Sequence, residues 1–193
     1  MATLIDSYSE TNKDSSEPLQ GGAGYFAFGN SFTTLNDGNN YNITSAKFYL
    51  AKTGSPSGNM TARLYAHSGT YGTSSKPTGS VLGTSDAINA STLTGTFTLT
   101  EFTFTGAQQY TMTANTQYCI QIFFSTGSSG NVVDVGEDGS SPTHGGNYFA
   151  EAPEGTWASY NGIDVPFYVY GEVGAAAAAA PAVKRRRIIS HRR

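Results

Sequence analysis

Residues 47–86 decide the fold class, and they read KFYLAKTGSPSGNMTARLYAHSGTYGTSSKPTGSVLGTSD. Phe48 and Leu50 occupy alternate positions, and residues 60–65 repeat this pattern after the turn SPSGN. An alternation with a period of two, interrupted by Gly, Pro and Asn, indicates strands with one buried face. We therefore expect the two strands on either side of this turn to form a half-buried antiparallel pair.

The same alternation recurs along the chain and predicts about ten strands without a helix between them. These strands cover residues 3–8, 25–32, 41–52, 60–67, 81–88, 97–105, 117–124, 131–135, 147–150 and 166–173. Within FTLTEFTFT, residues 97–105, the alternation slips by one place at Glu101, which predicts a β-bulge. Strands at this spacing predict an all-β fold, an antiparallel β-sandwich of the jelly-roll or Greek-key type, followed by a C-terminal extension.

The amino-acid composition agrees with a sandwich that faces an extracellular environment. Aromatic residues make up 12% of the chain, which is enough to fill a core between two sheets. Charged residues make up 13%, about half of the roughly 25% found in ordinary globular proteins. Ser, Thr, Asn and Gly must therefore cover most of the surface, as is common in extracellular and virion-exterior proteins.

Charge divides the chain into a body and a tail. We expect a sandwich over residues 1–173, an alanine-rich linker over 174–183 and a basic tail over 184–193. Residues 1–183 hold fourteen acidic and five basic residues, a net charge of −9, whereas the last ten residues carry +6. A flexible spacer with a charged tip is the simplest interpretation of this pattern.

The basic tail offers the strongest chemical signal in the sequence. Its charged and apolar residues are Lys184, Arg185, Arg186, Arg187, Ile188, Ile189, Arg192 and Arg193. Arginine presents a planar fork to carboxylate or phosphate groups. Three hypotheses stay open: docking to a virion or surface protein, with the two isoleucines as a short hydrophobic latch, contact with nucleic acid, and a free solvated tail.

No catalytic signature is present, and we expect the protein not to be an enzyme. The patterns GxSxG, HExxH and the phosphate-binding P-loop are absent, and the three histidines lack the spacing of metal ligands. The single cysteine, Cys119, lies in the apolar segment QYCIQIFF and is expected to be a small buried residue rather than a nucleophile.

Two loops contain candidate binding residues. Asp134, Glu137 and Asp138 lie in an acidic, glycine-bearing turn whose oxygens could bind calcium, although the EF-hand register is absent; a solvated turn is the alternative.

The second loop is a candidate glycan site. Trp157, Tyr160, Asn161 and Asp164 combine aromatic rings with hydrogen-bonding groups, as sugar-binding sites do. The alternative is that the aromatic side chains fold down onto the edge of the sandwich.

The first residues, MATLIDSYSE, show neither a basic region nor an apolar run, so no signal peptide is visible. No stretch approaches the roughly 18 apolar residues of a membrane span. A protein with an exterior-type surface and no export signal could leave the cell by lysis, as phage structural proteins do.

Several segments together resemble the choice-of-anchor R type of β-sandwich domain: KFYLAKTGSPSGN, ARLYAHSGTYGTSSKPTGSVLGTSD, ANTQYCI, GEDGSSPTHGGN and PFYVYG. The resemblance covers most of residues 1–173. It implies a sandwich from bacterial surface proteins or phage and metagenomic virion proteins, followed by a variable attachment device, and it implies no catalytic residues. The chain departs from bacterial surface members because the basic tail stands where a hydrophobic anchor or sorting motif would be.

The sequence thus leads to three functional hypotheses. The first is a non-enzymatic structural protein of a virion exterior, a decoration or fibre-like subunit that is attached through its tail, binds glycans and forms homo-oligomers. The second is a free extracellular carbohydrate-binding module. The third is a jelly-roll capsid protein whose basic tail contacts the genome.

Overall fold

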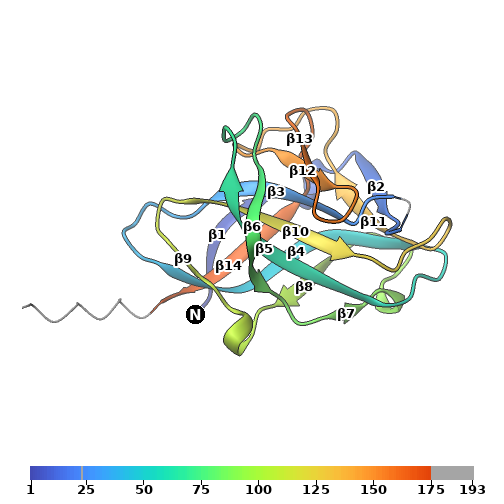
Figure 1. Ribbon diagram of the computed structural model, residues 1–193, viewed down its shortest axis with the longest axis horizontal. Helices are drawn as coiled ribbons and strands as arrows, with labels where there is room; N and C mark the ends of the chain where they lie inside the picture. Colours follow the sequence, from blue (N-terminus) through green and yellow to red (C-terminus); the bar gives the residue numbers. More distant parts are fainter. Residues whose placement is uncertain (23, 175–193) are drawn as a thin grey trace, which may run out of the picture.

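The computed structural model describes residues 1–22 and 24–174 as two antiparallel sheets packed face to face (Figure 1). The first sheet contains β1 (Thr3–Tyr8), β2 (Ser15–Leu19), β4 (Tyr41–Thr53), β8 (Thr98–Thr103), β9 (Thr111–Met112), β11 (Val132–Glu137) and β14 (Phe167–Val173). The second sheet contains β3 (Ala27–Thr33), β5 (Asn59–Ser68), β6 (Lys76–Thr84), β7 (Ile88–Asn89), β10 (Gln117–Phe124), β12 (Tyr148–Glu151) and β13 (Trp157–Tyr160). Three single-turn 3-10 helices lie at Glu10–Asn12, Ala90–Thr92 and Gly106–Gln108.

The strand order confirms an all-β jelly-roll sandwich. Four strands of the first sheet run in the order β1-β14-β4-β8, and four of the second run in the order β3-β10-β5-β6. Apart from the β5–β6 hairpin, consecutive strands of these eight lie in opposite sheets, as in the two Greek keys of a jelly roll. All ten expected strands are present, and the four that the sequence did not reveal, β2, β7, β9 and β13, are short edge elements.

The expected pairing across the turn SPSGN is wrong. β4 lies in the first sheet beside β14, β8 and β11, whereas β5 lies in the second sheet beside β10 and β6. The turn carries the chain from one sheet to the other, and both strands bury their apolar residues in the shared core. Alternation predicts which face of a strand is buried, but it does not predict which strand lies beside it.

The core fills the space between the sheets with aromatic and aliphatic side chains. Its largest fully buried members include Phe28, Phe32, Phe48, Phe102, Phe104, Phe124 and Phe167. The rings of Phe48 and Phe102 meet edge to face, with centroids 6.2 Å apart, which is a favourable aromatic arrangement. Cys119 is fully buried, as expected, and burial raises the pKa of its thiol.

The bulge expected at Glu101 is also wrong. β8 pairs with β4 without interruption from Leu50↔Thr98 to Ser45↔Thr103. The alternation slips because Phe97 lies on the outer face, where its ring contacts Tyr49 with centroids 5.4 Å apart and the Lys13 ammonium lies 4.4 Å from its centroid.

An extension at one end of the sandwich contains the strands that line the candidate functional site. Between β10 and β14 the chain adds β11 to the first sheet and β12 and β13 to the second, and β2 pairs with β11. These four strands lengthen both sheets on the same side of the molecule (Figure 1).

Two of the three phenylalanines of FTLTEFTFT, Phe97 and Phe102, test this assignment of faces. Phe102→Ala should lower the free energy of unfolding by about 3–5 kcal/mol, because it leaves a cavity in a core position that is fully buried. Phe97→Ala should cost less than about 1.5 kcal/mol because its ring lies outside the core. Urea denaturation of both variants measures the difference, and equal losses would contradict the assignment.

Candidate functional site

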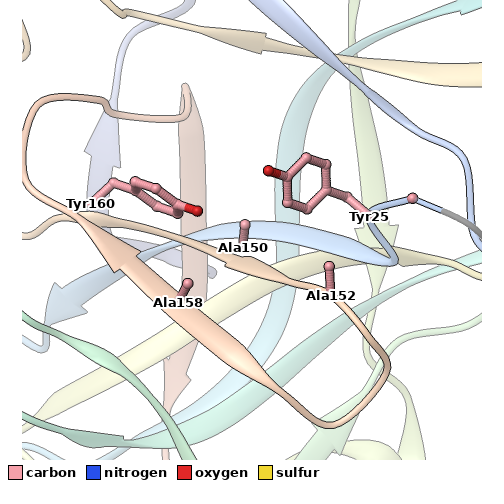
Figure 2. Close-up of a pocket in the computed structure, with 6 residues that line it drawn as sticks. Tyr25, Ala150, Ala152, Ala158 and Tyr160 are labelled. Carbon is pink, nitrogen blue, oxygen red and sulfur yellow. The ribbon is translucent and has the colours of Figure 1, made fainter.

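A cleft opens at the extended end, over β12 and β13 of the second sheet and beside the segment that precedes β3. Its volume is about 400 Å³, and its lining residues are Gly24, Tyr25, Ala150, Ala152, Ala158 and Tyr160. Tyr25 precedes β3, and Tyr160 ends β13. Figure 2 shows the two tyrosine side chains on opposite sides of the cleft with their hydroxyls turned toward one another and the alanines beneath them. We call this space the tyrosine cleft.

The alanines make room for the cleft. Ala150 and Ala158 are direct partners across β12 and β13, so two methyl groups stand where larger side chains would fill the space. Ala152 follows the end of β12. The result is a hollow with an apolar floor and phenolic walls, which is the mixture of apolar surface and few polar groups that small-molecule sites use.

A second, smaller space adjoins the tyrosine cleft and shares Tyr25 and Tyr160 with it. This acidic pocket has a volume of about 80 Å³ and is lined by Glu17, Tyr25, Glu137, Tyr148, Tyr160 and Ile163. Three tyrosine rings surround it, and the centroids of Tyr148 and Tyr160 lie 5.5 Å apart. The Phe28 ring packs against two of them, with centroid distances of 4.9 Å to Tyr25 and 5.6 Å to Tyr148.

The strand geometry of β11 places Glu137 in this pocket. Side chains alternate along a strand, so Val133, Val135 and Glu137 share the face that looks into the sandwich. The two valines belong to the core, and Glu137 is only 3% exposed. Its Oε1 is buried and has no hydrogen-bond partner among the described residues. A buried acceptor without a partner is rare in proteins and marks a place where a ligand or water would bind.

The surroundings of Glu137 favour its protonated form. Burial, together with the negative charges of Glu17 and Asp14, raises the pKa of Glu137 to about 7, and the Tyr148 hydroxyl opposes the shift. Burial likewise raises the pKa of Tyr25, helped by Tyr160 and by both glutamates. The Tyr25 phenol therefore stays protonated at neutral pH, while Glu137 changes charge close to it.

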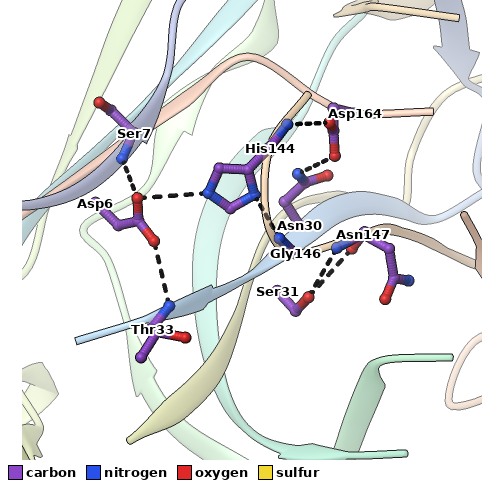
Figure 3. Close-up of polar contacts among 9 residues, drawn as sticks. All are labelled: Asp6, Ser7, Asn30, Ser31, Thr33, His144, Gly146, Asn147 and Asp164. Atoms are coloured by element: carbon purple, nitrogen blue, oxygen red, sulfur yellow. Dashed lines mark hydrogen bonds and ion pairs between the residues drawn. The ribbon is translucent and has the colours of Figure 1, made fainter. Parts of the chain in front are cut away.

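A buried polar network fixes the loops beside the site (Figure 3). The carboxylate of Asp164, only 1% exposed, accepts hydrogen bonds from Asn30 Nδ2 at 2.8 Å and from the His144 amide at 3.0 Å. Asn30 Oδ1 in turn accepts from the Val165 amide at 3.1 Å. The network thus joins β3 to the loop before β14 and to the loop after β11.

His144 extends the network to β1. Its Nε2 lies 3.4 Å from Asp6 Oδ1, and its Nδ1 accepts a hydrogen bond from the Gly146 amide at 3.1 Å. The other oxygen of Asp6 accepts from the Thr33 amide at 3.2 Å (Figure 3). Both sheets and the two loops are therefore tied together next to the pocket.

The structure separates the four residues of the expected glycan loop. Trp157 and Tyr160 lie three positions apart on β13, so they point to opposite faces. The Trp157 indole packs edge to face on Tyr65, with centroids 5.4 Å apart, and its Nε1 donates to Gln121 Oε1 at 3.2 Å. Asp164 is buried in the polar network, and Asn161 is exposed. Tyr160 alone of these residues lines the cleft.

The expected calcium ligands do not converge either. Asp134 and Glu137 point to opposite faces of β11, and Asp134 accepts a hydrogen bond from Thr53 Oγ1 at 2.7 Å. Asp138 accepts from the Tyr8 hydroxyl at 2.5 Å and from the amides of Ser140 and Ser141. Within residues 1–22 and 24–174, no three His, Cys, Asp or Glu side chains are grouped so that they could hold a metal ion.

The remaining sequence predictions concern the C-terminal segment and the membrane. The linker after Gly174 and the docking tail, Lys184 to Arg187, Ile188, Ile189, Arg192 and Arg193, lie outside the described residues. In the part of the chain that the structure describes, no helix has the length and hydropathy of a membrane-spanning segment.

Tyr25 and Glu17 were not singled out from the sequence as site residues. One signal was present: in VVDVGE an acidic residue occupies the position that continues the apolar face of the strand. Burying a charged carboxyl group at such a position is costly, so its presence indicates a perturbed pKa and a candidate functional site.

No protein-family model matches the chain, and no curated protein matches it. The resemblance to choice-of-anchor R domains therefore stays a hypothesis, and the functional argument depends on the cleft itself.

The shifted pKa of Glu137 predicts a pH-dependent stability. Between its ordinary pKa of 4.5 and about 7, the folded protein keeps a proton that the unfolded chain has lost. The free energy of unfolding should therefore fall as the pH rises through this window, by up to about 3 kcal/mol from this group.

Glu137→Gln removes this titration. The variant should gain stability relative to the wild type as the pH rises from 5 to 8, as followed by chemical denaturation at each pH. The exposed substitution Glu154→Gln is the matched control and should keep the wild-type profile. Parallel profiles for wild type and Glu137→Gln would show that Glu137 titrates normally.

Proposed function

We propose that this protein is a non-enzymatic β-sandwich displayed on a virion or cell exterior, and that it binds glycans in the tyrosine cleft. The observation that carries the proposal is the pairing of Tyr25 and Tyr160 across an alanine floor. A volume of about 400 Å³ lies within the roughly 300–1,000 Å³ of small-molecule sites and suits one or two sugar rings.

The chemistry of the lining supports a sugar as the ligand. Tyrosine rings offer flat apolar faces to the C–H groups of a sugar ring, and their hydroxyls donate and accept hydrogen bonds. The Glu17 carboxyl, at the rim of the acidic pocket, adds an acceptor for sugar hydroxyls. The residues that support glycan binding therefore line the tyrosine cleft and the acidic pocket, whereas the sequence predicted a glycan site at the Trp157 loop.

The position of the cleft supports display on a surface. β14 begins at Phe167 beside Phe48 and ends at Val173 beside Tyr41, a span of about 20 Å. Its far end, which leads on to the basic tail, lies on the other side of the sandwich from β11, β12 and β13 (Figure 1). Attachment through the tail would leave the cleft facing outward, as a decoration or fibre-like subunit of the choice-of-anchor R type requires.

Glycan-array binding followed by titration calorimetry tests the proposal. Tyr160→Ala should weaken binding at least tenfold, since Tyr160 is 40% exposed and forms one wall of the cleft. Ala158→Phe should abolish binding because its ring would fill the cleft, whereas Ala158→Ser should bind like the wild type. Tyr170→Ala, a tyrosine outside the cleft, controls for general effects.

Two results would refute the assignment of the site. One is an array without any bound glycan, and the other is glycan binding that survives both Tyr160→Ala and Ala158→Phe.

The jelly-roll strand order favours a second candidate, a capsid subunit whose basic tail contacts the genome, because viral capsid proteins use this topology. Deletion of residues 184–193 separates the two. Release of the folded protein from otherwise normal particles is the result expected of an exterior subunit. Empty particles that retain the protein would instead identify a genome-binding arm, because six lost positive charges weaken phosphate contacts strongly.

A further inference from the structure

We propose that the ligand of this site carries a compact cation, such as the ammonium group of an amino sugar, and that the acidic pocket binds this group while the tyrosine cleft holds the sugar ring. The inference rests on the proposed function for the sugar, but the cation preference follows from the acidic pocket alone.

The first argument is charge. Two glutamates line the acidic pocket, Glu17 from β2 and Glu137 from β11, and no Lys, Arg or His lines this pocket or the tyrosine cleft among the described residues. Glu17 lies opposite Val135 in the β2–β11 pair, so Glu137 is its diagonal neighbour on the same face. An anionic ligand would be repelled here, and a cation would be attracted by both carboxyl groups.

The second argument is the unpaired acceptor. Glu137 Oε1 is buried without a hydrogen-bond donor, and a ligand ammonium would supply one. A hydrogen bond between an ammonium and a carboxylate is charge-assisted and roughly twice as strong as a neutral one. A bound cation would also remove the penalty of a buried, uncompensated negative charge.

The third argument is the aromatic lining. Tyr25, Tyr148 and Tyr160 all line the acidic pocket, so a cation in it contacts phenol rings from three parts of the chain. Cations are attracted to the faces of such rings, and desolvated sites make this attraction stronger. With Ile163 as the remaining lining residue, the pocket combines two carboxyl groups with aromatic and apolar surface.

The fourth argument is size. The acidic pocket, at about 80 Å³, has room for a small group, and the adjoining tyrosine cleft, at about 400 Å³, has room for a ring. A ligand with a ring and an attached cation matches this pair of spaces.

The charge of Glu137 makes the preference pH-dependent. The groups that face it are Glu17, Tyr25, Tyr148 and Tyr160, with Asp14 near by, and all of them are acids. With the pKa of Glu137 at about 7, the carboxylate form rises about tenfold between pH 6 and pH 8. A ligand with a permanent positive charge should therefore bind more tightly as the pH rises.

Titration calorimetry with three probes tests the inference. Glucosamine should bind at pH 7 at least tenfold more tightly than N-acetylglucosamine, which keeps the ring but lacks the charge. Choline, a permanent cation without a sugar ring, should bind more weakly than glucosamine, with an affinity that rises about tenfold from pH 6 to pH 8.

Substitutions at Glu17 and Glu137 show how much each carboxyl group contributes to the preference for a cation. Glu137→Gln should remove the preference for glucosamine over N-acetylglucosamine and the pH dependence of choline binding. Glu17→Gln, at an exposed position, should reduce the preference about two- to threefold without affecting folding, and Glu154→Gln should change nothing.

The outcomes distinguish this inference from the proposed function. Binding of N-acetylglucosamine with equal or weaker binding of glucosamine and choline would overturn the cation preference and support glycan binding. Choline binding that is lost in Glu137→Gln, without binding of any sugar, would support the acidic pocket and overturn glycan binding. Binding of none of the three probes would overturn the inference.

Discussion

The buried carboxylate of Asp164 is the interaction on which the functional end of the sandwich depends. It accepts hydrogen bonds from Asn30 of β3, in the second sheet, and from the His144 amide, and His144 pairs with Asp6 of β1, in the first sheet. The same carboxylate therefore holds both sheets and the loops between β11 and β14 in one arrangement. Fully partnered buried networks of this kind specify a single conformation more than they add stability. Here the network lies directly beside the acidic pocket, because Asn30 is the strand partner of Tyr148 and Asp164 follows Ile163, and both Tyr148 and Ile163 line that pocket.

Glu137 stands in contrast to Asp164. Both are buried carboxyl groups at the same end of the molecule, but Asp164 has donors and one oxygen of Glu137 has none. Close packing and hydrogen-bond satisfaction would both favour an apolar residue at position 137, next to Val133 and Val135. A destabilising residue at a concave position is typical of binding sites, where function is maintained at a cost in stability. The contrast indicates a structural role for Asp164 and supports the proposal that Glu137 binds a ligand.

The sequence predicts the class of fold well and the site poorly, for a physical reason. Burial of one strand face produces an alternation that is local in the sequence, so β1, β4, β10 and β14 could be located closely. Pairing depends on contacts between distant strands, which is why β4 and β5 were wrongly expected to lie side by side.

The site depends on such distant contacts throughout. Tyr25, Glu137, Tyr148 and Tyr160 come together only because β11 and β12 extend different sheets at one end. Trp157 misled because aromatic residues near glycines suggest an exposed platform, whereas its indole finds a hydrogen-bond acceptor in Gln121 and packs on Tyr65. Glu137 was predicted from the sequence to lie in an acidic turn as a calcium ligand, whereas its position continues the apolar face of β11, which is the one local clue to a buried carboxyl group.

The most direct test is an NMR titration of the Glu137 side-chain carboxyl carbon, with and without choline. The structure predicts a midpoint near pH 7 in the free protein, because burial and the neighbouring acids oppose ionisation. Bound choline should move this midpoint to lower pH, since a cation stabilises the carboxylate. A midpoint near 4.5 that choline leaves unchanged would show that Glu137 is an ordinary solvated side chain and would contradict the account of the site.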